Sequence, residues 1–181
     1  MKVINLFGGP GIGKSTISAA VFVELKKNNF RTELRTEFAK DLIYEQRESI
    51  LKCDQLYVFA KQNRKLSSLL SQDLEYVITD SPLFLQMIYN NPENLNQKIF
   101  EDLTIDVFRR YENINFLIKR NSKHVFQTDG RRHSFEESLE IDKIIKNKLL
   151  EHNVPFFEFE NNTRIVDKIV TKILEERMLR G

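Results

Sequence analysis

The stretch that decides the interpretation of this chain is Gly8-Gly9-Pro10-Gly11-Ile12-Gly13-Lys14-Ser15-Thr16. It matches the pattern G-x-x-x-x-G-K-[ST] at every fixed position. A mostly apolar run from Val3 to Phe7 precedes it, with Asn5 as the polar exception, and a helix-forming run follows from Ile17 to Lys27. This order of strand, loop and helix is the context in which the pattern carries meaning.

The loop predicts a binding site for the phosphates of a nucleoside triphosphate. Glycines lack a Cβ, so successive backbone N–H groups can turn inward and form a concave site for an anion. The N-terminus of the following helix adds partial positive charge. Lys14 can reach the β- and γ-phosphates, and the Ser15 hydroxyl can ligate Mg²⁺. The residues that we expect to bind the nucleotide are Gly9, Gly11, Ile12, Gly13, Lys14, Ser15 and Thr16, with Arg120 added from beyond the fourth strand.

Length and composition narrow the class of protein. With 181 residues, the chain suits a single domain, 1–181, with one core. The net charge of +2 argues against the global positive field of many nucleic-acid binders. A single cysteine, Cys53, excludes an internal disulfide, is expected to be a small core residue, and suits a reducing, cytoplasmic location. We expect no signal peptide and no membrane span.

Strands and helices are expected to alternate, which predicts a doubly wound α/β sheet. The expected strands are Val3–Phe7, Phe30–Thr36, Glu75–Thr79, Asn113–Ile118 and Pro155–Phe159. Among the helices, one should run from Pro92 to Arg110 with Leu95, Ile99, Leu103 and Val107 facing inward. Another should open with a capping box formed by Ser134 and Glu137. Ligands of such sheets bind beyond the carboxyl ends of the strands.

Two acids fall at this edge. Asp80 directly follows the third strand, where a carboxylate can orient Mg²⁺ or its waters; the alternative is that it caps the next helix. Glu37 ends the second strand, where a carboxylate can take the proton of a phosphoryl acceptor; the alternative is a favourable charge in the first turn of a helix.

Further candidates lie in the middle of the chain. In the long helix from about Asp54 to Leu70, Gln62 could bind a base edge and Arg64 a phosphate, although a solvated helix face explains them equally well. A basic segment, about residues 119–134, suits a lid whose Arg131 and Arg132 close over the transferred group; the alternative is a solvated basic loop.

These motifs resemble those of nucleoside and nucleotide kinases of the P-loop class, with thymidylate and deoxynucleoside kinases as the nearest comparison. The resemblance implies a three-layer α/β/α fold with a five-stranded parallel sheet in the order 2-3-1-4-5 and a lid. Phe59-Ala60-Lys61-Gln62 resembles the segment that holds the base in deoxynucleoside kinases, and Glu37 would serve the acceptor hydroxyl. Where these kinases commonly have an acid–arginine pair, this chain has Asp80-Ser81.

The same resemblance places adenine near the start of the lid and near Asn161–Arg164. The stretch Thr128-Asp129-Gly130-Arg131-Arg132, followed by Glu136-Glu137 and Ile141-Asp142, is similar to small ATP-binding proteins encoded by bacteriophages. Some relatives of those proteins act on modified bases in DNA.

Three functions remain in competition. The first is an ATP- and Mg²⁺-dependent transfer of phosphate to a small nucleoside or nucleotide. In this reaction Ser15 and Asp80 would hold the metal, and Glu37, Gln62 and Arg64 would bind the acceptor. The catalytic residues would be Lys14, Glu37, Asp80, Arg131 and Arg132. The second moves the phosphate to an end or a modified base of DNA or RNA. The third is a regulatory ATPase that works through a partner. The oligomeric state stays open, with a homodimer as one option.

Overall fold

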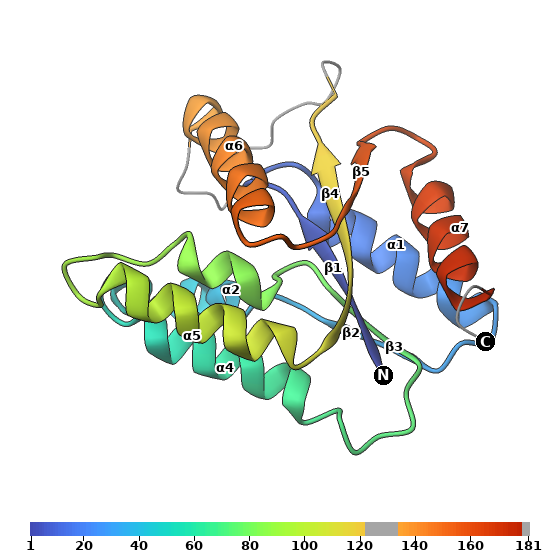
Figure 1. Ribbon diagram of the computed structural model, residues 1–181, viewed down its shortest axis with the longest axis horizontal. Helices are drawn as coiled ribbons and strands as arrows, with labels where there is room; N and C mark the ends of the chain where they lie inside the picture. The colour runs from blue at the N-terminus through green and yellow to red at the C-terminus, as the bar shows by residue number, and fades with distance from the viewer. Residues whose placement is uncertain (122–133, 179–181) are drawn as a thin grey trace.

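The computed structural model describes residues 1–121 and 134–178. Within them, five strands form a parallel sheet in the order β2-β3-β1-β4-β5, which confirms the predicted topology (Figure 1). Because all strands are parallel, their carboxyl ends meet at one edge of the sheet. The strands are β1 Lys2–Phe7, β2 Thr32–Arg35, β3 Tyr76–Thr79, β4 Glu112–Lys119 and β5 Phe157–Glu160.

The helices connect successive strands and cover both faces of the sheet, so the three-layer α/β/α arrangement is also confirmed. Their bounds are α1 Lys14–Lys27, α2 Phe38–Tyr44, α3 Ser49–Cys53, α4 Gln55–Ser67, the 3₁₀ helix η1 Leu83–Met87, α5 Gln97–Arg109, α6 Phe135–Glu151 and α7 Ile165–Met178. No helix in the described part of the chain is long and apolar enough to cross a membrane.

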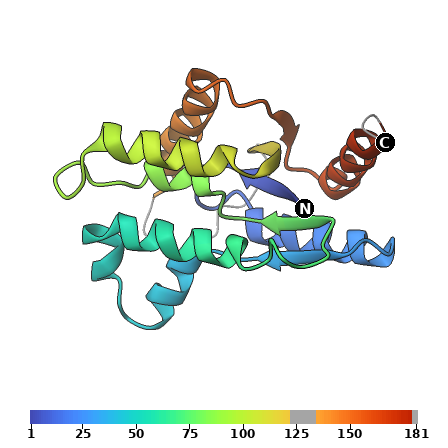
Figure 2. The ribbon, with the colours of Figure 1, turned by 60° about the horizontal axis from the view of Figure 1, so that its bottom comes forward.

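Burial on both faces explains why the first strand is mostly apolar. Val3 and Phe7 belong to the core that α4, α5, α6 and η1 complete, whereas Ile4 and Leu6 belong to the core under α1 and α7. Such two-sided burial is characteristic of central parallel strands. On the first face, the rings of Phe59 and Phe100 meet edge to face with centroids 5.6 Å apart, which joins the neighbouring helices α4 and α5 (Figure 2).

Asn5, the polar exception in β1, joins this strand to β4. Its side-chain amide donates to the Asn113 and Asn115 side chains at 2.8 and 3.0 Å, and Asn115 donates onward to the Pro155 carbonyl at 2.9 Å. In the ladder, Asn5 lies directly opposite Asn115. A buried polar side chain is costly unless it is hydrogen-bonded, so these contacts favour this register over a shifted one.

The expected helix from Pro92 to Arg110 was wrong at its start and in part of its buried face, although Leu95 and Val107 pack against the core as expected. Helix α5 begins at Gln97, where the Asn96 side chain accepts a hydrogen bond from the Ile99 amide, and Ile99 and Leu103 are exposed. When the helical spacing of apolar residues is counted from Pro92, it selects a stripe of side chains next to the one that is buried. The side chains of α5 that are buried are Phe100, Glu101, Thr104, Ile105 and Phe108.

The expected capping box is confirmed, whereas the expectation for Cys53 was wrong and most of the lid is not described. The capping box of Ser134 and Glu137 is present at the start of α6. Helix α3 was not expected, and Cys53 at its end is exposed rather than part of the core. The predicted lid, residues 119–134, lies mostly outside the described residues, as do Arg131 and Arg132.

The start of α5 can be tested with a matched pair of substitutions. Asn96→Ala removes the side chain that caps the helix and should lower the free energy of unfolding by about 1 kcal/mol. Pro92→Ala changes an exposed residue upstream of the helix and should alter it by less than about 0.5 kcal/mol. Urea unfolding followed by circular dichroism measures both. A larger loss for Pro92→Ala would show that the helix begins where the sequence pattern first suggested.

Candidate active site

The phosphate loop joins β1 to α1, and backbone geometry explains its glycine-rich sequence. Gly13 immediately precedes α1 with a φ angle of 93°, a left-handed conformation that favours glycine. Lys14 folds back over the loop, and its Nζ donates to the Gly8 and Gly9 carbonyls at 2.6 and 3.0 Å. Ile12 is buried in the core, and its carbonyl accepts a hydrogen bond from the Asn161 side chain at 2.8 Å. The loop is therefore anchored from the segment directly after β5 as well as from its own strand and helix.

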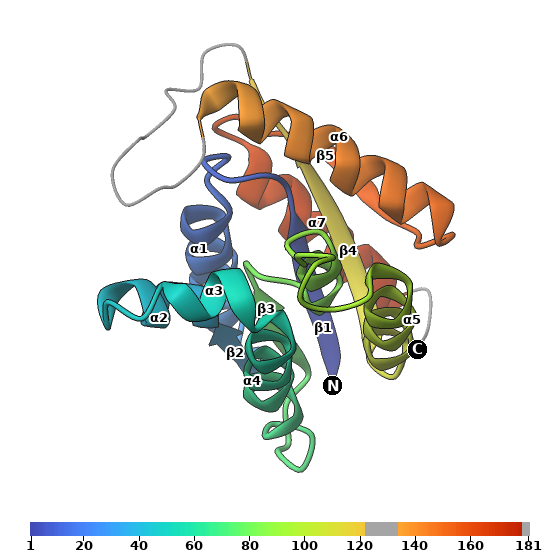
Figure 3. The same ribbon diagram turned by 90° about the vertical axis from the view of Figure 1, so that its left-hand side faces the viewer.

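Helix α6 also contacts the loop, through Asp142. One carboxylate oxygen of Asp142 accepts a hydrogen bond from the Gly9 amide, and the other accepts from Arg120 Nε, both at 2.5 Å. Arg120 in turn donates to the Pro10 carbonyl at 2.7 Å. The N-terminal part of α6 consequently lies beside the loop (Figure 3). Arg120, predicted to bind the nucleotide, is placed at the loop and is paired with an acid.

This contact gives Gly9 a steric role. A Cβ on Gly9 would come within 2.7 Å of both the Ser138 carbonyl and the Asp142 side chain. Because the Ser138 carbonyl belongs to the helix backbone, any side chain at position 9 would push α6 away from the loop. The glycine therefore permits the close approach of α6.

Asp80 lies at the carboxyl end of β3, as predicted, with only 2% of its surface exposed. The helix that follows, η1, is preceded by Pro82 and has no side-chain cap, so the alternative role of Asp80 as a helix cap is excluded. The Lys40 ammonium lies 3.5 Å from Asp80 Oδ2 and donates to the Ser15 hydroxyl at 2.6 Å. The structure thus brings both predicted metal ligands to a single cation.

These two residues fit a hard divalent cation. Asp80 Oδ1 is buried and has no hydrogen-bond partner in the described ranges, and the hydroxyl and carboxylate oxygens are ligands that Mg²⁺ prefers. Ser15 and Asp80 are therefore the residues that would hold a metal ion at this site.

Glu37 precedes α2 as its N-cap residue, but its carboxylate makes no capping hydrogen bond. Burial raises the pKa of Glu37, while the nearby Lys14 and Lys40 ammonium groups oppose the rise. Burial likewise lowers the pKa of Lys14, opposed by Glu37, Asp80 and Asp142. The donor-side lysine and the proposed acceptor-side acid therefore lie within electrostatic reach of each other.

Gln62 and Arg64, both expected to bind the acceptor, lie on opposite faces of α4. The Gln62 side chain is buried, accepts a hydrogen bond from the Phe38 amide at 2.9 Å and donates weakly to the Thr36 carbonyl at 3.5 Å. In this structure it supports the turn that carries Glu37. Arg64 is exposed, because two positions along a helix turn a side chain to the opposite face.

Three residues near the site were missing from the predicted set. Lys40 follows Glu37 by one helical turn, so its spacing was a usable signal. Asp142 belongs to the Ile141-Asp142 pair already noted in the sequence. Tyr89 had no local signal; burial raises its pKa, and the charges of Glu37 and Asp142 add to the rise.

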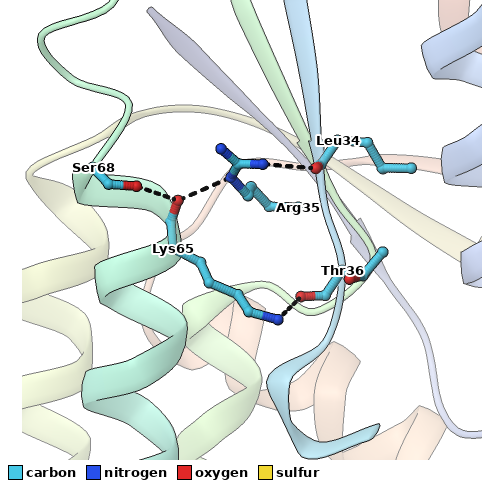
Figure 4. Close-up of a pocket in the computed structure, with 5 residues that line it drawn as sticks. All are labelled: Leu34, Arg35, Thr36, Lys65 and Ser68. Atoms are coloured by element: carbon cyan, nitrogen blue, oxygen red, sulfur yellow. Dashed lines mark hydrogen bonds between the residues drawn. The ribbon is translucent and has the colours of Figure 1, made fainter. Parts of the chain in front are cut away.

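A hollow of about 320 Å³ lies beside the site, between β2 and α4 (Figure 4). It is lined by Leu34, Arg35, Thr36, Lys65 and Ser68. Arg35 and Ser68 both donate to the Lys65 carbonyl, and the Lys65 ammonium reaches Thr36 at 3.4 Å and Asp41 at 2.8 Å. Lys14, Glu37 and Asp80 do not line it, so the hollow is separate from the candidate transfer site.

A second group of polar residues, at the junction of α5 and α6, has the residue types of a metal site. Glu101, Glu151 and His152 place possible ligand atoms within 4.8 Å of one another. The Lys148 ammonium already pairs with Glu101 at 2.9 Å and with Glu151 at 3.0 Å. Burial tends to raise the pKa of Glu101, but hydrogen bonds from Lys148 and His152 outweigh it and lower the pKa. We interpret this group as an ion-pair network between two helices.

The parallel sheet, the phosphate loop at its carboxyl edge and the carboxylate after β3 define a P-loop nucleoside triphosphate-binding protein. The chain belongs to an AAA domain family, whose model matches residues 3–165. No curated protein is similar enough in sequence to count as a relative.

Solved structures with this fold include two kinases. One is a deoxyadenosine kinase from M. mycoides with its products dCMP and dCDP bound, at 19% identity and a TM-score of 0.51. Another is a thymidylate kinase from Ehrlichia chaffeensis, at 15% identity and a TM-score of 0.63. Each alignment covers 97% of this chain and 98% of the other. At these identities the likeness establishes a shared fold.

The clamp between α6 and the loop can be tested with Asp142→Ala. The substitution removes the Asp142 carboxylate from Arg120, whose side chain is 10% exposed. We expect the free energy of unfolding to fall by about 2 kcal/mol and ATP to bind more weakly. Lys143→Ala, which breaks an exposed pair with Glu140 on the same helix, is the matched control and should change stability by less than about 0.5 kcal/mol. Equal losses in urea unfolding would contradict the clamp.

Proposed function

We propose that the protein is a Mg²⁺-dependent ATP phosphotransferase that moves the γ-phosphate to a hydroxyl or phosphate group of a nucleoside or nucleotide. The observation that carries the proposal is the position of Glu37. Its carboxylate lies within electrostatic reach of Lys14 and Asp80, yet its side chain does not cap the helix that it precedes. A carboxylate so placed is available to a second substrate opposite the phosphate loop.

On the donor side, Lys14 supplies positive charge at the loop that would hold the β- and γ-phosphates. In this structure its ammonium binds two loop carbonyls, and these contacts can be exchanged for phosphate oxygens. Phosphoryl transfer depends mainly on positioning and on electrostatic stabilisation, so a lysine held over the loop is well suited to it. A magnesium ion at Ser15 and Asp80 would neutralise charge on the phosphates.

On the acceptor side, Glu37 would receive the proton of the attacking hydroxyl. Burial raises its pKa, which makes it a better proton acceptor when ionised, while Lys14 and Lys40 favour the ionised form. The hydrogen bonds between Gln62 and the backbone on both sides of Glu37 fix the turn from which the carboxylate projects. Positioning of this kind reduces the reorganisation that transfer requires.

The charges near the site favour a small acceptor over a polymer. Lys40 pairs with Asp80, Lys65 with Asp41, and Arg120 with Asp142. A nucleic-acid track needs several cations directed at a backbone, and in the described part of the chain, with no metal bound, these three are each engaged with an acid. The deoxyadenosine and thymidylate kinases of the same fold act on nucleosides or nucleotides by name, which supports that acceptor class.

The acceptor can be identified with γ-labelled ATP. The wild-type protein should transfer label to a nucleoside or a nucleoside monophosphate in a panel that also contains DNA and RNA. Lys14→Ala should lower the transfer rate at least about a hundredfold, because the charge over the loop is lost. Lys168→Ala, an exposed position on α7, is the control and should keep full activity. Label released only as inorganic phosphate would indicate an ATPase, and label on DNA or RNA a polymer kinase.

The role of Glu37 predicts a dependence on pH. Transfer requires its ionised form, so kcat/KM should rise with pH through the pKa of Glu37, which burial raises above its ordinary value of 4.5. Glu37→Gln should lower kcat at neutral pH by about a hundredfold or more and remove this acidic limb. Glu45→Gln, at the exposed end of the same helix, should leave rate and profile unchanged. An unchanged profile in Glu37→Gln would exclude Glu37 as the base.

A further inference from the structure

Lys40 occupies a specific place in the site. Its ammonium donates to the Ser15 hydroxyl at 2.6 Å and lies 3.5 Å from Asp80 Oδ2, so it contacts both residues that fit a divalent cation. The Lys40 side chain is 40% exposed, whereas the Asp80 side chain is 2% exposed. A flexible and partly hydrated cation therefore reaches inward to a buried anion.

The Asp80 charge explains why Lys40 is held there. A buried carboxylate without a neighbouring opposite charge is strongly destabilising. Within the described ranges, Lys40 is the ion-pair partner found for Asp80, while Lys14 is bound to the loop carbonyls. Lys40 thus balances the Asp80 charge when no metal is bound.

A metal and the ammonium cannot occupy this place together. The ammonium uses a lone pair of the Ser15 oxygen at 2.6 Å, and a metal bound through the same oxygen would lie within a few ångströms of it. Two positive charges at such a distance repel each other strongly in a partly buried site. The two cations therefore compete for this place.

We propose that Lys40 is a displaceable counter-ion of the metal site, which occupies the Ser15–Asp80 position in the metal-free protein and is expelled when a divalent cation binds. The proposal rests on the proposed function only in assigning the metal to these two residues. Lys40 is thereby a positioning residue, since it keeps Ser15 and Asp80 together and sets the affinity of the site for metal.

The position of Lys40 on α2 gives the exchange a consequence. Lys40 lies in the first turn of α2, one turn after Glu37. An ammonium that leaves Asp80 remains tethered to this turn and so stays on the acceptor side of the site. Metal binding on the donor side therefore adds a mobile positive charge near the acceptor, where it can attract an anionic group.

The test measures Mn²⁺ binding to the nucleotide-free protein by electron paramagnetic resonance of free Mn²⁺. Lys40→Met removes the competing charge and keeps the length of the side chain, and it should bind Mn²⁺ at least about tenfold more tightly than wild type. Lys40→Arg keeps the charge and should stay within about threefold of wild type. Lys168→Met, on the exposed side of α7, is the matched control and should bind as wild type does.

Melting curves provide a second measurement on the same proteins. Without metal, Lys40→Met should melt below wild type because Asp80 has lost its counter-ion, and Mn²⁺ should raise its melting temperature more than that of wild type. Asp80→Asn combined with Lys40→Met should abolish the gain in Mn²⁺ affinity. Unchanged or weaker Mn²⁺ binding by Lys40→Met, or no Mn²⁺ binding by either protein, would overturn the proposal. Neither measurement uses ATP or an acceptor, so this outcome is distinct from failure of phosphoryl transfer.

Discussion

The structure of the site depends on the burial of one charge, the Asp80 carboxylate at the end of β3. Only 2% of its surface is exposed, so its charge must be balanced from within the protein or by a bound cation. Lys40 on α2 provides a positive charge 3.5 Å from its Oδ2, and Lys14 on α1 lies within electrostatic reach. Because these lysines come from different helices, the balance of charge draws α1 and α2 toward the same edge of the sheet.

A second constraint acts on the other side of the phosphate loop, where α6 is held against Gly9. The contact needs three elements of the sequence: a glycine at position 9, an acid on α6 that accepts its amide, and Arg120 to neutralise that acid. The capping box at Ser134 fixes where α6 begins, and therefore which residue of the helix faces the loop. The loop is thus enclosed by parts of the chain that are far apart in sequence.

The fold could be predicted from the sequence to a large extent, because its determinants are local. Apolar strands, the phosphate loop and the capping box each depend on residues within a few positions of one another. The face of α5 could not be assigned so well, since the pattern placed the start of the helix at Pro92 rather than Gln97 and only tertiary packing decides which stripe is buried. Ser15 and Asp80, the expected metal ligands, could be picked out because one belongs to the phosphate-loop motif and the other directly follows β3.

The two halves of the site differ in how far local sequence specifies them. Phosphate binding relies on backbone amides and one lysine, so a short motif determines it almost completely. The proposed acceptor half would be assembled from β2, α2, α4 and the segment after η1, and no short motif records how they meet. Gln62 illustrates the point: its sequence context suggested a base-binding side chain, but in the folded protein its amide supports the backbone on both sides of Glu37. A buried amide that satisfies the backbone must stay in place, so in the proposed function discrimination among acceptors would come from the shape of the surrounding site and from groups, such as Lys40, for which we propose a movement.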